Sequence, residues 1–185
     1  MKQKLKLFST KKEIESFLGE APLIAASIRT TDACNIRCSH CYTEGGLVSK
    51  NELNTQEMKS IIDQLAKLKT LYVFFTGGEP FVRPDMVDIL RHTSNRKIGI
   101  SVSTNGQLIN KEILEKLKGL NFTLFQISIE GTEKIHDAIT GEKTWHKAVE
   151  TIGLAKSVLK KNIGVGTVMM QKNWKVLDRV LAEAS

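Results

Sequence analysis

The chain of 185 residues is 41% hydrophobic and 25% charged, with 13 glycines, 3 prolines and 3 cysteines. These proportions exclude a disordered chain, a collagen and a disulfide scaffold, and the length fits one domain smaller than a complete eight-stranded α/β barrel. Lys and Arg outnumber Asp and Glu by 27 to 20, a net charge of +7, but the basic residues are spread along the chain. We expect a solvated basic surface, because no zinc-finger spacing or RNA-binding strand pattern indicates a nucleic-acid partner.

The sequence contains neither a signal for a membrane-spanning helix nor one for secretion. No apolar run approaches the roughly 20 residues that a membrane-spanning helix needs. The first residues, Met-Lys-Gln-Lys-Leu-Lys, lack the apolar block of a signal peptide. We therefore expect a cytoplasmic protein with no membrane partner.

Short runs of β-branched and aromatic residues alternate with longer amphipathic segments. The expected strands are 23–28, 71–75, 98–103, 123–129 and 163–169. The expected helices are 55–68, 85–92, one that carries Leu117 and is capped by Asn110, 145–159 and 174–184. Strands that alternate with helices indicate an α/β fold with a parallel sheet and right-handed crossovers. Residues 1–20 lie outside this repeat, with a short helix expected around 12–18.

All three cysteines fall within eight residues, in the sequence Cys34-Asn-Ile-Arg-Cys38-Ser-His-Cys41 after the first expected strand. Three thiols this close cannot all be paired, and a cytosolic chain seldom keeps disulfides, so the pattern indicates a metal or cluster site. Thiolates suit zinc or iron–sulfur centres. Three of them would leave one iron of a [4Fe–4S] cluster open to chemistry. Zinc with His40 as fourth ligand is the alternative, although adjacent His40 and Cys41 would point inward together with difficulty.

Polar or glycine-rich segments lie at the ends of the next three expected strands. They are Phe75-Thr76-Gly77-Gly78-Glu79-Pro80, Ser103-Thr104-Asn105-Gly106 and Gln126-Ile127-Ser128-Ile129-Glu130-Gly131. Because the carboxyl ends of parallel strands meet on one face, these segments are expected to converge with the cysteine loop. Taken singly, the two glycines or the Asn-Gly pair would indicate only a turn. Taken together, the four segments predict an active site.

The C-x3-C-x2-C spacing resembles the cluster motif of the radical S-adenosylmethionine (SAM) enzymes, and Gly77-Gly78-Glu79-Pro80 resembles their G-G-E-P segment. The segment from Ile135 to Gly141 is similar to the subgroup that carries an additional SPASM domain. The resemblance covers about residues 22 to 175. It implies a partial (β/α) barrel of parallel strands with about five of the six family strands. In this interpretation 1–21 form an N-terminal extension, and 22–185 form a radical SAM core that is incomplete at its C-terminal end.

The resemblance also implies the roles of individual residues. Cys34, Cys38 and Cys41 would hold a [4Fe–4S] cluster. The SAM-binding residues would be His40, Gly77, Gly78, Glu79, Pro80, Ser103, Asn105, Ser128 and Glu130. In this scheme His40 stacks near the adenine, the Gly-Gly-Glu backbone and Glu79 hold the methionine amino group, and Ser128 and Glu130 meet the carboxylate or ribose. We expect Gly78 to let the backbone approach SAM closely. We also expect His136 and His146 to be packed or solvent-facing, and Met169 and Met170 to lie in the core.

The implied activity is that of a radical SAM enzyme, an oxidoreductase. It cleaves SAM reductively, and the resulting 5′-deoxyadenosyl radical abstracts hydrogen from a peptide or tetrapyrrole-type substrate, with ferredoxin or flavodoxin as an electron donor. Two alternatives stay open: a non-catalytic truncated remnant that binds a cluster or SAM, and a zinc-stabilised binding module. Without a sixth strand, the outer edge of the fifth strand would be unpaired, which favours self-association.

Overall fold

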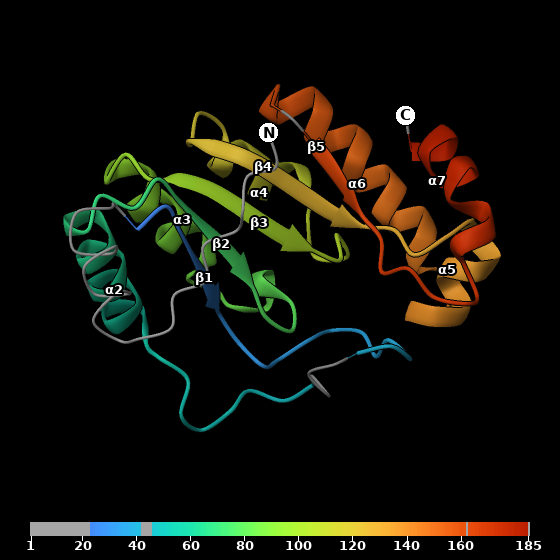
Figure 1. Ribbon diagram of the computed structural model, residues 1–185, viewed down its shortest axis with the longest axis horizontal. Helices are drawn as coiled ribbons and strands as arrows, with labels where there is room; N and C mark the ends of the chain where they lie inside the picture. The colour runs from blue at the N-terminus through green and yellow to red at the C-terminus, as the bar shows by residue number, and fades with distance from the viewer. Residues whose placement is uncertain (1–22, 42–45, 162, 185) are drawn as a thin grey trace, which may run out of the picture.

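The computed structural model describes residues 23–41, 46–161 and 163–184. Five parallel strands form one sheet in the order β1-β2-β3-β4-β5 (Figure 1). The strands are β1 (Ala25–Arg29), β2 (Tyr72–Thr76), β3 (Gly99–Thr104), β4 (Phe122–Ser128) and β5 (Ile163–Gly166). All five expected strands are confirmed, and β5 ends earlier than expected, at Gly166. The open parallel sheet is the partial (β/α) barrel that the sequence indicated.

Helices connect successive strands and so allow every strand to run in the same direction. The connecting helices are α2 (Thr55–Lys67), α3 (Met86–Asn95), α4 (Lys111–Leu117), α5 (Glu133–Thr140) and α6 (Thr144–Leu159). Helix α7 (Leu177–Ala184) follows β5, and 3-10 turns lie at Pro80–Val82 and Trp174–Val176. Helix α5 was not expected, and the last expected helix begins as a 3-10 turn. The helix expected around 12–18 lies outside the described residues.

Two of the helices begin at asparagines that the sequence marks as caps. The Asn54 side chain accepts the backbone N–H groups of Gln56 and Glu57, and the Glu57 carboxylate accepts the N–H of Asn54, which completes a capping box at α2. The Asn110 side chain accepts the N–H of Ile113 at α4. These local bonds fix where both helices start.

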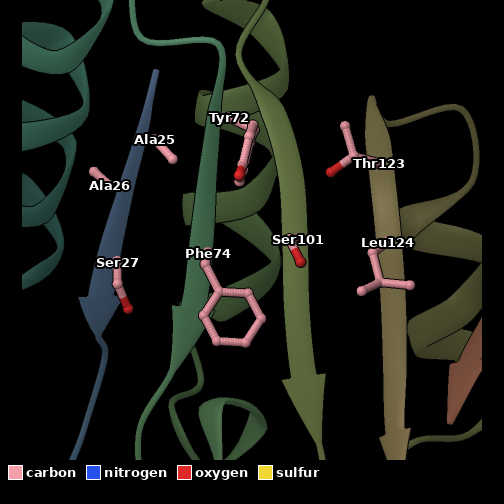
Figure 2. A pocket seen from close by; sticks show the side chains of 8 residues that line it. All are labelled: Ala25, Ala26, Ser27, Tyr72, Phe74, Ser101, Thr123 and Leu124. Atoms are coloured by element: carbon pink, nitrogen blue, oxygen red, sulfur yellow. The ribbon is translucent and has the colours of Figure 1, made fainter. Parts of the chain in front are cut away.

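The two faces of the sheet differ in what covers them. One face packs against helices, and the core there contains completely buried side chains such as Val73, Phe75, Ile100 and Phe125. The other face carries an open cavity of about 730 Å³. Figure 2 shows the side chains that line it, among them Tyr72, Phe74 and Leu124. Alternation along each strand sends neighbouring residues to opposite faces, so this face is the inner surface of the partial barrel.

The described part of the chain corrects one expectation about the core. Met169, expected in the core, is 72% exposed, and Met170 is only half-buried, because the strand ends at Gly166 and the chain leaves the sheet. Val180 of α7 is buried in the core instead. No described helix is long and apolar enough to cross a membrane.

Candidate functional site

The carboxyl ends of the strands surround a second cavity, of about 410 Å³. Among the expected site residues, it is lined by Cys34, Cys38, Cys41, His40, Gly77, Gly78, Ser103, Asn105, Ser128 and Glu130. Glu79 and Pro80 do not line it. The cavity on the inner sheet face is larger but contains no cysteine or carboxylate, so the smaller cavity is the candidate site.

The cysteine loop, residues 30–41, is fastened to two neighbouring elements. The N–H groups of Gly78 and Glu79 donate to the carbonyl oxygens of Thr31 (2.7 Å) and Ala33 (2.8 Å). The N–H of Ser39 donates to the carbonyl of Ile139 in α5 at 2.7 Å. The loop is therefore held by backbone hydrogen bonds within the protein, before any ligand binds.

None of the three cysteines forms a disulfide; Cys34 and Cys38 are half-buried and Cys41 is exposed. Burial, together with the neighbouring Cys34 and Cys41, raises the pKa of Cys38 to about 12. Burial also raises the pKa of Cys34. Without a cation these groups stay protonated, whereas a bound metal centre supplies the positive charge that stabilises thiolates.

The arrangement of these thiols bears on which metal centre fits. In the described ranges, no three His, Cys, Asp or Glu side chains surround a position for a single metal ion. In a [4Fe–4S] cluster each thiolate binds a different iron, so the sulfurs need not converge on one point. Three soft thiol donors beside a cavity thus fit a cluster better than a tetrahedral zinc ion.

The two glycines after β2 lie against the cysteine loop. A Cβ atom at Gly78 would lie 2.2 Å from the Ala33 carbonyl oxygen, and one at Gly77 would lie 2.6 Å from that of Thr31. Both glycines line the cavity, so a ligand can also reach them. In this structure Gly78 must lack a side chain because its backbone lies against residues 32 and 33, which lead into Cys34.

Glu79 joins two of the converging loops. Its side chain is 1% exposed and accepts the Thr104 hydroxyl (2.7 Å), the Asn105 N–H (2.7 Å) and the Phe81 N–H (3.1 Å). Burial raises the pKa of Glu79, and the donated hydrogen bonds oppose the rise. The carboxylate is thus engaged inside the protein, and the contact with SAM expected of it stays a prediction.

Glu130, at the end of β4, is almost completely buried beside the cysteine loop. Its Oε1 lies 3.7 Å from His40 Nε2, and its Oε2 accepts the N–H of Val168 at 2.9 Å. Burial raises the pKa of Glu130, with Val168 and His40 opposing the rise. His40 Nδ1 is buried and has no hydrogen-bond partner among the described residues, so it is available to a ligand.

Sequence reasoning missed several residues that line the site, namely Gln107, His136, Thr140, Gly166, Thr167 and Val168. Gln126 belongs to the expected strand-end segment but was not named as a contact; it shares a strand face with Ser128 and donates to the Ser103 hydroxyl at 3.2 Å, a relationship that strand alternation could have revealed. His136 is packed, as expected, at 2% exposure, but it also borders the cavity. His146 is exposed and lies 3.0 Å from Glu133.

Known proteins share this sequence pattern and this fold. The sequence profile of the Radical SAM superfamily matches residues 28–182. Mycofactocin maturase MftC of Mycobacterium tuberculosis is 32% identical over 167 residues, which cover 90% of this chain and 42% of MftC. PqqA peptide cyclase of Bradyrhizobium diazoefficiens is 28% identical over 160 residues (85% and 42%), and Fe-coproporphyrin III synthase of Methanosarcina barkeri is 34% identical over 114 residues (61% and 29%).

The crystal structure of Streptococcus suis SuiB bound to S-adenosylmethionine shares the fold, with a TM-score of 0.80 at 18% identity over 92% of this chain and 40% of SuiB. The chain spans about two fifths of the length of MftC and PqqA peptide cyclase. The superfamily uses a [4Fe–4S] cluster and SAM, the two cofactors that the cysteine loop and strand ends indicated. From the family profile, which matches most of its length, the chain belongs to the radical SAM superfamily.

Proposed function

We propose that the chain is the SAM-cleaving core of an enzyme that modifies a peptide. The observation that carries the proposal is the convergence of three cysteine thiols and four strand ends on one cavity of about 410 Å³. When bound, a reduced [4Fe–4S] cluster supplies one electron that cleaves SAM to methionine and a 5′-deoxyadenosyl radical, which abstracts hydrogen from the substrate.

The protein would contribute ligands and placement. Cys34, Cys38 and Cys41 would hold three irons and leave the fourth open to SAM. The backbone at Gly77 and Gly78 lines the cavity beside the thiols, where it can receive the methionine moiety. Holding the sulfonium next to its electron source is an orientation effect, which is a large part of what a protein adds to cofactor chemistry.

The remaining side chains of the cavity would select and orient SAM. Ser103 and Asn105 come from the end of β3, and Ser128 and Glu130 come from the end of β4. His40 presents a buried, unpartnered Nδ1 next to Glu130. These polar groups suit the carboxylate, ribose and adenine, while Glu79 and Pro80 would act from behind the cavity by positioning the loop after β3.

A peptide is favoured over a tetrapyrrole as the substrate. PqqA peptide cyclase matches 85% of this chain, whereas Fe-coproporphyrin III synthase matches 61% of it. The match to the peptide-modifying relative therefore extends over more of this chain. A ferredoxin or flavodoxin would supply the electron.

Anaerobic reconstitution with iron and sulfide, followed by a 5′-deoxyadenosine assay under reduction, tests the proposal. We expect about four iron and four sulfide per chain, and loss of both after Cys34→Ala, Cys38→Ala or Cys41→Ala. Ser39→Ala, in the same loop, is the matched control and should keep the cluster.

Other outcomes of this experiment identify the alternatives. A cluster that forms without 5′-deoxyadenosine production would favour a non-catalytic remnant. Stoichiometric zinc without iron, in protein isolated without oxygen, would show a zinc-stabilised module and contradict the proposal.

A further inference from the structure

Asn105, directly after β3, is held in one orientation by two hydrogen bonds. Its own N–H donates to Glu79 Oε2 at 2.7 Å, and its side-chain Oδ1 accepts the N–H of Gln107 at 2.9 Å. A backbone N–H can only donate, so the atom that faces Gln107 must be the amide oxygen. The amide nitrogen of Asn105 therefore faces the opposite way, toward the cysteine loop.

The amide nitrogen of Asn105 meets two acceptors in that loop. Nδ2 lies 2.9 Å from Asn35 Oδ1 and 3.7 Å from Cys34 Sγ. An amide NH₂ group carries two hydrogens, so it can donate to both acceptors at once. Cys34 thus receives a hydrogen bond from a residue 71 positions later in the chain, on a different strand end.

We propose that Asn105 raises the reduction potential of the cluster by donating this hydrogen bond to Cys34 Sγ. The inference rests on the proposed function, in which Cys34 is a cluster ligand. Adding an electron increases the negative charge on the cluster and its thiolates, and an N–H dipole that points at one of these sulfurs stabilises the reduced form. Asn105 acts on the cluster through Cys34, so it is a positioning residue.

The way Asn105 is anchored supports this role. Glu79 is buried and also accepts the Thr104 hydroxyl, so the N–H of Asn105 binds a carboxylate that is itself fixed. The Glu79 N–H donates to the Ala33 carbonyl, one residue before Cys34. The backbone on each side of the Asn105–Cys34 bond is therefore tied to the same buried residue, Glu79, and the Asn105 side chain itself is oriented by the N–H of Gln107.

The test is a redox titration of the reconstituted 185-residue chain, followed by electron paramagnetic resonance in the absence of SAM. Asn105→Leu keeps the shape of the side chain and removes its donor, and Asn105→Ala is a second variant in case leucine disturbs folding. Asn35→Ala is the matched control, because it removes the competing acceptor and leaves the bond to Cys34. We expect more negative midpoint potentials in both Asn105 variants, unchanged iron and sulfide content, and no negative shift in Asn35→Ala.

Omitting SAM separates this role from a contact with the cofactor, because loss of such a contact cannot move the potential of SAM-free protein. Equal potentials in wild type and in either folded, cluster-loaded Asn105 variant would overturn the inference. An equal negative shift in Asn35→Ala would also overturn it, since loop geometry would then be the cause. If neither Asn105 variant assembles a cluster, Asn105 governs assembly and the inference is wrong. If the wild-type chain binds no iron, the proposed function itself fails.

Discussion

The backbone N–H of Glu130 donates a hydrogen bond to Nδ1 of His136 at 2.9 Å, which joins the end of β4 to helix α5. The accepting nitrogen must be unprotonated, so the ring is neutral and carries its hydrogen on Nε2. Burial lowers the pKa of His136 to about 4, with Asp137 opposing the shift. A buried neutral histidine thus orients the segment that contains Glu130.

This histidine predicts a pH-dependent loss of stability. An unfolded chain protonates His136 near pH 6.5, whereas the folded protein resists protonation down to about pH 4. In this window the unfolded state binds more protons, so the free energy of unfolding falls as the pH falls, by about 1 kcal/mol per pH unit from this group. Urea unfolding of wild type and His136→Asn between pH 4.5 and 7.5 measures it. The variant should show the weaker dependence of the free energy of unfolding on pH.

Gly78→Ala should disturb the cysteine loop. The added Cβ would overlap the Ala33 carbonyl, and overpacking of this kind costs about 1–3 kcal/mol. We expect reduced stability and reduced iron incorporation, measured by urea unfolding and metal analysis. Gly153→Ala in α6 is the control, because a Cβ there meets no atom within 4 Å and alanine favours a helix. A variant with a normal cluster and weaker SAM binding would instead assign Gly78 to the ligand alone.

Glu79→Gln should loosen the loop after β3. The amide can accept through only one atom, so its NH₂ group would face a backbone N–H donor, at a cost of about 1–3 kcal/mol. Faster hydrogen exchange at the Asn105 amide, together with a lower urea midpoint, would report this change. Exposed Glu112→Gln should leave both measurements unchanged. Normal hydrogen exchange at the Asn105 amide in Glu79→Gln would show that the hydrogen bonds to the Glu79 carboxylate are not needed to hold the loop after β3.

The open face of the sheet predicts self-association of this chain. Tyr72 is 39% exposed there, and Phe74 and Leu124 line the same cavity (Figure 2). No other strand in the described ranges pairs with the outer edges of β1 and β5, and an apolar face next to such edges favours association. Light scattering should show oligomers that Tyr72→Lys reduces and Leu68→Lys, at the end of α2, does not. A stable monomer for wild type would contradict this prediction.

The sequence by itself determined the elements whose signals are local. The spacing of Cys34, Cys38 and Cys41 marked the cluster loop, and Asn54 and Asn110 marked two helix starts. Short runs of β-branched and aromatic residues located all five strands, because such side chains pack well in a sheet. The segments that resemble the family motifs contain most of the residues that line the cavity.

The tertiary structure decided what depends on partners far along the chain. Helix α5 has eight residues, too few to be stable alone, and it is held by the bond between His136 and Glu130 and by Asp137, whose carboxylate accepts the N–H of Trp145 at 2.9 Å. Gly78 meets Ala33, 45 residues earlier, and Asn105 meets Cys34. A sequence motif indicates which residue type occupies such a position, but only the tertiary structure shows which distant residue it contacts. Contacts between separate strand ends leave no periodic pattern in the sequence.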